Sequence, residues 1–328
     1  MAADIFAMNR IAQARRKKRF EAGSVEFKNR EFHFTLNPES NYPIKYSESA
    51  KMQSKQLVEE FMLLANVLIA EHLYKHCQDK ALLRTHDDIK DGRKEYLNSF
   101  FRKVGIEIDL SDNLSLRRSI EAIKSQHNSE DKLHVINRQF LKNLQQAKYQ
   151  CVENLSPEEY FHFGLNFEIY THFTSPIRRY ADLLVHRLLT ITLKEKENTR
   201  SLLDGLDYSE YAEEISEKSY NARKASKECE ALFHCLLLRD QGCKVFEALV
   251  FEVDINFITV YIHDLNMHCN IRLKEDKRID QTTYFDDDLL VACNFKQPLI
   301  LAEGVKNYKG AEELKKSNQQ RIREQRMK

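Results

Sequence analysis

Apolar residues in the first 240 positions recur mostly at spacings of three and four, the pattern of amphipathic helices packed against a core. Gly23 ends the first of these stretches, and residues 24–27 and 31–36 then alternate in polarity like a short pair of strands. Only eight glycines and five prolines occur in 328 residues, which favours long helices over loops. The pattern predicts helices over 4–22, 56–77, 93–104, 114–127, 131–148 and 207–239.

One further helix is predicted to begin at Ser175, because serine caps free N–H groups and the following proline suits the first helical position. Arg178 and Arg179 would then lie in its first turn, where the helix dipole disfavours cations. Two arginines there indicate a bound anion such as phosphate, and the alternative is a solvated surface with both arginines paired to acids. The apolar stripe behind them comprises Ile177, Tyr180, Ala181, Leu184, Val185, Leu188 and Leu189.

The pattern changes near residue 240, where short runs rich in Val, Ile and Phe replace the helical spacing. Such runs are typical of a small OB-type barrel, a fold that binds single strands on one face. The tail from Lys306 is basic without an apolar period, which predicts a disordered extension. We therefore expect an α+β chain in three parts, 1–240, 241–305 and 306–328. The predicted strands are 244–253, 257–262, 267–273, 289–294 and 298–301.

Net charge and cysteine usage limit the kind of nucleic-acid site and the cellular compartment that we expect. The 51 Lys and Arg nearly balance 50 Asp and Glu, giving a formal net charge of +1. Any nucleic-acid site must therefore be a local patch or a channel. The seven cysteines form no C-x-x-C pair, which is typical of reduced thiols in a cytoplasmic protein, with the nucleus as an alternative location. No apolar run reaches the ~18 residues that span a bilayer, so no membrane partner is expected.

The string Thr-His-Phe-Thr-Ser-Pro-Ile-Arg-Arg-Tyr-Ala-Asp at 171–182 closely resembles the signature of the ribonuclease II / ribonuclease R family. These RNB-domain enzymes are 3′→5′ exoribonucleases, and the string looks most like the eukaryotic, exosome-associated branch. Residues 57–66 form a second family-like block, and 82–86 resembles a short arginine–histidine segment whose usual prolines are replaced here. The resemblance covers roughly residues 5–305. It implies the C-terminal part of an RNB nuclease domain, mostly helical, followed by an OB-type RNA-binding barrel.

The resemblance also implies roles for individual residues. Arg178 is the expected catalytic residue, contacting the scissile phosphate and stabilising developing negative charge. Arg179 is expected to hold a neighbouring phosphate or an acidic side chain. Glu59 or Glu60 would accept a hydrogen bond from the ribose 2′-hydroxyl, which distinguishes RNA from DNA, and the sequence does not choose between them.

Four more residues are expected to line the RNA channel. Arg19 ends the basic run 15–19, which in the family leads into the channel, although a solvated helix end is the simpler interpretation. His172, Thr174 and Ser175 belong to the signature itself. Histidines among aromatic residues are more often core groups, so His172 also has a structural interpretation.

The family hydrolyses RNA with magnesium held by clustered aspartates in a Gly/Asp-rich motif. That motif is absent from this sequence, and we predict no metal ligand. Three interpretations remain open. The chain is a portion of an enzyme that degrades single-stranded RNA to nucleoside monophosphates, a non-catalytic RNA-binding module, or part of a split or incompletely described enzyme. The expected partners are single-stranded RNA and either the exosome or a second polypeptide carrying the N-terminal half.

Overall fold

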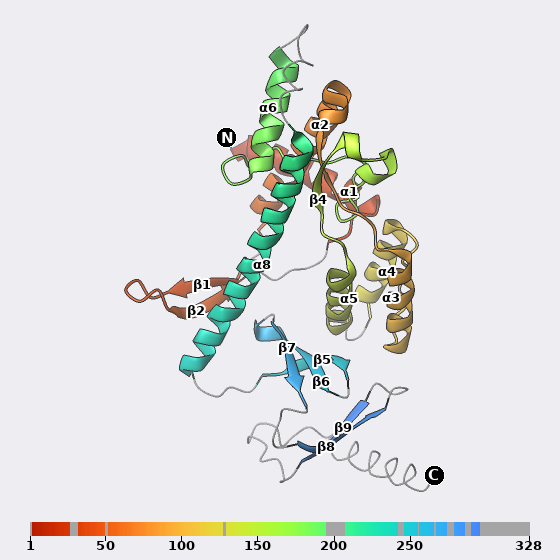
Figure 1. Cartoon of the computed structure of the whole chain (residues 1–328), viewed down its shortest axis with the longest axis vertical. Helices are drawn as coiled ribbons and strands as arrows, with labels where there is room; N and C mark the ends of the chain where they lie inside the picture. The colour runs from red at the N-terminus through yellow and green to blue at the C-terminus, as the bar shows by residue number, and fades with distance from the viewer. Residues whose placement is uncertain are drawn as a thin grey trace. The chain divides into compact units, whose positions relative to one another are not determined.

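The computed structural model describes residues 2–26, 32–49, 52–126, 129–194, 207–241, 246–254, 256–265, 267–273, 279–285 and 290–295. The chain divides into two compact units, Met1–Asp240 and Gln241–Lys328 (Figure 1). The helices of the first unit are α1 (Ala2–Glu21), α2 (Gln53–Cys77), α3 (Asp91–Lys103), α4 (Asn113–Lys124), α5 (Ser129–Asn143), α6 (Tyr180–Lys194) and α8 (Tyr208–Gln241). Its strands are β1 (Phe32–Leu36), β2 (Pro43–Glu48), β3 (Leu82–Thr85) and β4 (Lys148–Cys151).

The helices predicted over 4–22, 56–77, 93–104 and 114–127 are confirmed to within a few residues, and α8 matches the stretch predicted at 207–239. Side-chain caps fix several of these starts. Asp112 accepts the backbone N–H of Ser115 at 2.8 Å in front of α4, and Asp207 accepts two backbone N–H groups in front of α8. The helix predicted over 131–148 was too long, because α5 ends at Asn143. Its last residue, Lys148, is the first of β4, which pairs antiparallel with β3 and buries Tyr149 and Cys151 on one face.

The strand pair predicted from 24–27 and 31–36 was half wrong. β1 pairs with β2, and Ser24–Glu26 forms no strand, while residues 27–31 lie outside the described ranges. Gly23 explains why the chain turns here, since its φ of +108° is accessible mainly to glycine. A Cβ at Gly23 would also lie 3.0 Å from the backbone nitrogen of Leu114, so the end of α1 packs backbone to backbone against α4.

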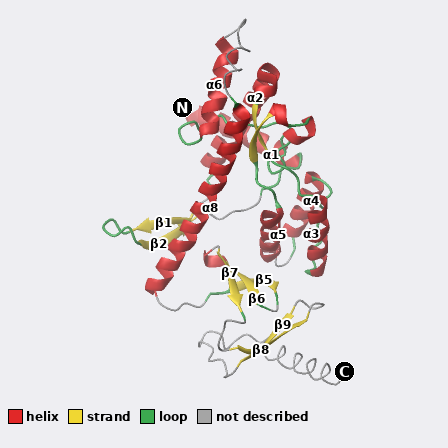
Figure 2. Ribbon diagram, viewed as in Figure 1, coloured by secondary structure: helices red, strands yellow, loops and turns green. Residues whose placement is uncertain are grey.

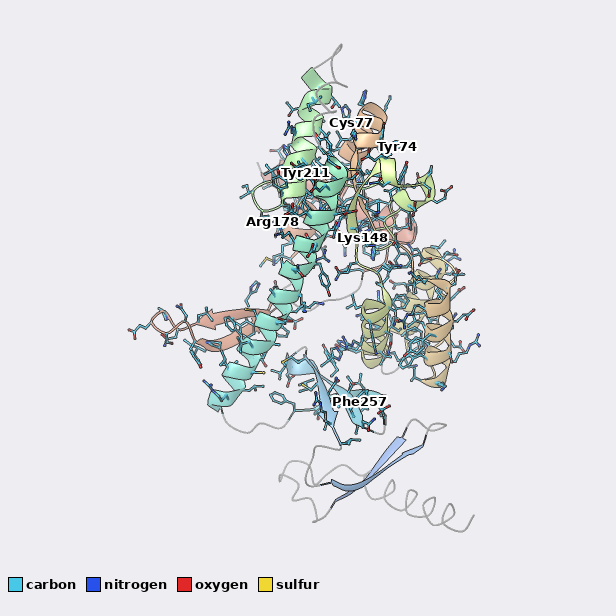
Figure 3. All side chains as sticks on the ribbon, in the orientation of Figure 1. Tyr74, Cys77, Lys148, Arg178, Tyr211 and Phe257 are labelled. Carbon is cyan, nitrogen blue, oxygen red and sulfur yellow. The ribbon has the colours of Figure 1, made fainter. Side chains whose placement is uncertain are left out.

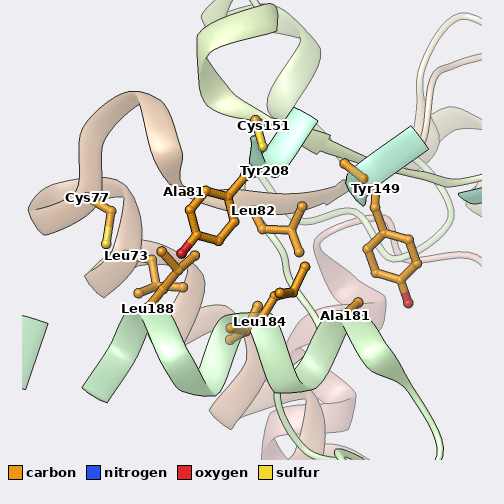
Figure 4. Close-up of a cluster of buried hydrophobic side chains, with 12 residues drawn as sticks. Leu73, Cys77, Ala81, Leu82, Tyr149, Cys151, Ala181, Leu184, Leu188 and Tyr208 are labelled. Atoms are coloured by element: carbon orange, nitrogen blue, oxygen red, sulfur yellow. The ribbon is translucent and has the colours of Figure 1, made fainter. Parts of the chain in front are cut away.

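Helices make up most of the first unit (Figure 2). Two hydrophobic clusters hold this unit together. The first joins α2, β3, β4, α6 and the start of α8, with Leu73, Leu82, Val185, Leu188 and Tyr208 fully buried (Figure 4). The second lies among α3, α4 and α5, where Phe101 stacks against Phe140 with ring centroids 6.2 Å apart. The first cluster contains Ala181 and packs against Phe173, so it supports the 171–182 signature string. None of the described helices is long and apolar enough to cross a membrane.

The second unit begins with a three-stranded antiparallel sheet in the order β5 (Ala248–Val253), β6 (Phe257–Ile262), β7 (Met267–Arg272). A separate hairpin pairs β8 (Ile279–Phe285) with β9 (Leu290–Phe295). The strands predicted at 244–253, 257–262, 267–273 and 289–294 correspond to β5, β6, β7 and β9, whereas β8 was not predicted. These paired strands do not establish a closed barrel, so the OB-type fold stays a prediction. The strand expected at 298–301 and the tail at 306–328 lie outside the described residues.

Candidate nucleic-acid interface

The family signature occupies an extended segment that leads into α6 and lies between β3 and α2. The backbone N–H of Arg84 donates to the carbonyl of Tyr170 at 2.7 Å, which continues the β3 pairing. Asn66 on α2 then ties the segment down at two points. Its amide donates to the Tyr170 hydroxyl at 2.9 Å, and its carbonyl accepts the backbone N–H of Phe173 at 2.9 Å. Asn66 is buried, so these bonds fix the course of the signature.

The helix expected from Ser175 begins only at Tyr180, which corrects the predicted cap. Asp182 is fully buried in the first turn of α6, and its Oδ1 accepts the backbone N–H of Ser175 at 2.7 Å, which ties the preceding segment to the start of the helix. A carboxylate is favoured at this end of a helix because the dipole is positive there. Ile177 and Tyr180 are therefore exposed rather than part of the buried stripe, which holds Ala181, Leu184, Val185 and Leu188.

The two signature arginines have different surroundings. Arg179 forms a two-pronged pair with Asp182, in which Nε and one terminal nitrogen each donate to a carboxylate oxygen at 2.8 Å. Arg178 lies on the exposed turn before α6 (Figure 3), and no ion pair of its side chain is found within the described ranges. The expectation that Arg179 holds an acidic side chain is met, whereas Arg178 is the arginine available to a ligand.

Glu59 and Glu60 differ in burial and in their partners. Glu60 is 2% exposed, and its Oε1 accepts from Arg19 at 2.6 Å with Arg16 at 3.8 Å. Arg19 donates further to Ser24 Oγ at 2.8 Å, so this RNA-binding candidate is committed to a partly buried network. Glu59 is the exposed member of the pair and lies at the rim of a concave surface, 3.8 Å from Arg19. Of the two carboxylates, Glu59 is the one that is accessible from solvent.

The concave surface is a pocket of about 480 Å³ between α2 and the signature segment. Apolar side chains of α2 form most of its wall, with Lys55, Glu59 and Arg179 as its charged groups. A pocket with a carboxylate and two cations at an apolar wall suits a nucleotide, whose base is apolar on its face and whose sugar and phosphate are polar. The lining residues are Ser54, Lys55, Val58, Glu59, Met62, Leu63, Asn66, Tyr170 and Arg179.

Sequence reasoning did not assign Tyr149 or Arg84 to the site, but both lie close to His172. Burial, with Arg179 and Arg84 nearby, lowers the pKa of His172 to about 2. Its Nδ1 shares a hydrogen bond of 2.6 Å with the Tyr149 hydroxyl. Arg84 stacks over that tyrosine ring at 4.3 Å and is 5% exposed. Thr174 Oγ1 is buried with no hydrogen-bond partner in the described part of the chain.

The described residues do not fit a magnesium site. Magnesium prefers carboxylate oxygens, and no group of three or more His, Cys, Asp or Glu side chains gathers within the described ranges. Asp182 is already occupied by Arg179 and the Ser175 N–H. The motif that sequence reasoning sought is therefore not replaced by residues brought together in the described parts of the fold.

Comparison with known proteins places this geometry in a family. A profile described as the RNB domain matches residues 1–195, more than half of the chain. The chain belongs to the RNB-domain family. DIS3-like exonuclease 2 of Schizosaccharomyces pombe is 30% identical over 291 residues, which are 87% of this chain and 31% of that protein. Such relatives place the chain in the eukaryotic, exosome-nuclease-like branch, and it spans under a third of that relative's length.

Two solved structures share the fold. Mycoplasma genitalium RNase R in complex with ribose-methylated single-stranded RNA aligns with a TM-score of 0.74 at 20% identity, over 88% of this chain and 44% of that one. Yeast Ssd1, described as a pseudonuclease, aligns with a TM-score of 0.62 at 22% identity, over 76% of this chain and 30% of that one. The fold is therefore shared by a ribonuclease and by a pseudonuclease.

Proposed function

We propose that residues 1–240 form the RNA-gripping part of a 3′→5′ exoribonuclease domain that acts on single-stranded RNA. The observation that carries this proposal is the pocket between α2 and the signature segment, which presents the exposed Glu59 next to Arg179. In this proposal Glu59 accepts a hydrogen bond from the ribose 2′-hydroxyl, a group that DNA lacks. The β strands of the second unit are proposed to form a single-strand-binding OB-type barrel.

Arg178 is proposed to be the catalytic residue of this part. Its guanidinium is exposed on a turn that is fixed by Asp182, so it can donate to a phosphate without first breaking an ion pair within the described ranges. Donors aimed at developing negative charge typically contribute about 3–4 kcal/mol to transition-state stabilisation. Hydrolysis to nucleoside monophosphates also needs carboxylates for magnesium, which the described residues do not supply. We therefore derive no hydrolytic step from these residues alone.

A second candidate is a non-catalytic RNA-binding module. The lack of a clustered metal-binding group within the described ranges favours it, as does the shared fold of the pseudonuclease Ssd1. Association with the exosome, or with a second polypeptide that carries the aspartates, is a proposal that rests on the family resemblance. A cytoplasmic or nuclear location is proposed because Cys77, Cys151, Cys229, Cys235 and Cys269 are free thiols.

Binding tests the proposal first. Purified residues 1–328 should bind a labelled RNA oligomer more tightly than the matched DNA in fluorescence anisotropy. Glu59→Gln should reduce that preference by about tenfold, the usual value of a hydrogen bond to a charged group. Glu71→Gln is the matched control, since Glu71 is an exposed glutamate on the same helix outside the pocket. An unchanged RNA preference in Glu59→Gln would contradict the assigned role.

Cleavage then separates the two candidates. The same chain is incubated with a 5′-labelled RNA and magnesium. A metal-dependent ladder that shortens from the 3′ end, lost in Arg178→Ala but not in Arg187→Ala, supports the nuclease. Binding without a ladder supports the non-catalytic module. Arg187 is a suitable control because it is an exposed arginine on α6.

A further inference from the structure

Arg84 is a buried cation without a carboxylate partner in the described part of the chain. It projects from β3 with 5% of its surface exposed, and its Nη1 has no hydrogen-bond partner there. One face of its guanidinium stacks on Tyr149, 4.3 Å from the ring centroid. Burying a charge without a partner is costly, so such groups are normally paired or bind a ligand. The stacked face leaves the edge of the guanidinium, where its donors lie, for that ligand.

The surroundings of Arg84 are positively charged. Burial lowers the pKa of Arg84 to about 10, and the nearby Arg223 and Arg179 act in the same direction. Asp182 neutralises Arg179 but is saturated by it and by a backbone N–H. The exposed Arg223 on α8 has no ion pair among the described residues. The Thr174 hydroxyl is a second buried polar group in the signature segment, and its oxygen has no partner in the same ranges. The unpartnered Arg84 donor and the positive charge around it fit an anion.

We propose that Arg84 and Thr174 form a buried phosphate-binding site, distinct from the one assigned to Arg178, that holds a backbone phosphate of the bound strand. This site rests on the proposed RNA-binding function. Arg223 would add a longer-range charge from α8. Tyr149 and His172 are positioning residues, because the 2.6 Å bond between them fixes the ring on which the guanidinium lies. The planar fork of arginine suits two phosphate oxygens at once, which a lysine at this position would not reproduce.

Salt dependence of RNA binding tests the charge of Arg84. On a single strand, the slope of log affinity against log salt changes by about 0.7 for each phosphate that the protein neutralises. Arg84→Gln should make the slope shallower by this amount and weaken binding about tenfold at low salt. Tyr149→Phe keeps the ring but removes the bond to His172, so it should weaken binding with an unchanged slope. Arg187→Gln removes an exposed arginine elsewhere and should leave low-salt affinity nearly unchanged.

Inorganic phosphate provides a readout that does not depend on RNA. Phosphate should raise the melting temperature of the wild-type chain above that in chloride of equal ionic strength. The rise should be reduced in Arg84→Lys and in Thr174→Val, which change donors without leaving a vacant core position. A rise equal to wild type in both variants would overturn the site even if Arg84→Gln does not fold.

The outcomes separate this site from the proposed function. Wild-type protein that is stabilised by phosphate but does not bind RNA would refute the proposed function and leave the anion site intact. Wild-type protein that binds RNA, with an unchanged salt slope in folded Arg84→Gln, would refute the anion site alone.

Discussion

The buried Glu60–Arg19 pair makes a quantitative prediction about α1 and α2. At 2.6 Å and an effective dielectric constant of about 20, the gross attraction is about 6 kcal/mol, most of which offsets desolvation. Removing one partner of a buried pair leaves an uncompensated charge and costs about 3–5 kcal/mol. Arg19 keeps Ser24 and has Glu59 at 3.8 Å, so we expect Glu60→Gln to lose about 3 kcal/mol.

For a unit of this size that loss lowers the melting temperature by about 6–12 °C. The measurement is thermal unfolding followed by circular dichroism, with urea titration to confirm an unchanged m value. Glu59→Gln is the matched control on the adjacent position. It is half exposed and should change stability by less than about 0.5 kcal/mol. Equal losses for the two variants would show that the separation of their roles is wrong.

Three further predictions concern charge and packing. In the folded chain, burial lowers the pKa of His162 to about 3 and that of His172 to about 2. In the unfolded chain both histidines have a pKa of about 6.5, so below that pH the unfolded chain binds more protons than the folded chain. Stability should therefore fall as pH drops from about 6.5, by about 1.4 kcal/mol per pH unit for each histidine, and His162→Gln should flatten urea midpoints measured between pH 7 and 5. Asp182→Asn weakens the pairing of buried Asp182 with Arg179 and should cost about 3 kcal/mol in urea unfolding, whereas a loss below about 1 kcal/mol would contradict its role as the partner of Arg179. Phe140→Ala should cost about 3–5 kcal/mol by cavity formation, while Leu141→Ala, half exposed beside it, should cost much less in the same assay.

Helical periodicity was sufficient to predict α2, α3, α4 and α8, because each buries one side on a core. It also predicted α1, although Ile5, Met8 and Ile11 of that helix are exposed. Periodicity failed to predict elements whose structure depends on tertiary contacts. Lys148 was predicted as the end of a helix, but its pairing with Thr85 of β3 makes it the start of a strand. The strand β2 begins with Pro43, which weakens its strand signal although proline is tolerated at that position.

The sequence identified which segment forms the site, but it did not predict how the side chains of that segment pair with each other and with α2. The signature pointed to Arg178 and Arg179, yet Ser175 and Pro176 indicated a helix start five residues before Tyr180. The Asp182 carboxylate accepts the backbone N–H of Ser175 from seven residues away, and local spacing cannot reveal that. Sequence reasoning left Glu59 and Glu60 equivalent because their difference depends on Arg19, which is 41 residues from Glu60.

The bond from the Asn166 amide to the carbonyl of Ala22 spans 144 residues, and the Asn66–Tyr170 bond spans 104. At about 5–20 residues per second, a ribosome needs about 7–30 s to synthesise the first of these intervals. Throughout that time α1 and α2 lack the segment that closes the pocket, and Ile5, Phe6 and Ile11 are exposed even in the finished fold. A nascent chain halted before residue 166 should therefore carry helices but no pocket. We expect it to be captured by chaperones that bind apolar segments, and to be released once the signature has emerged.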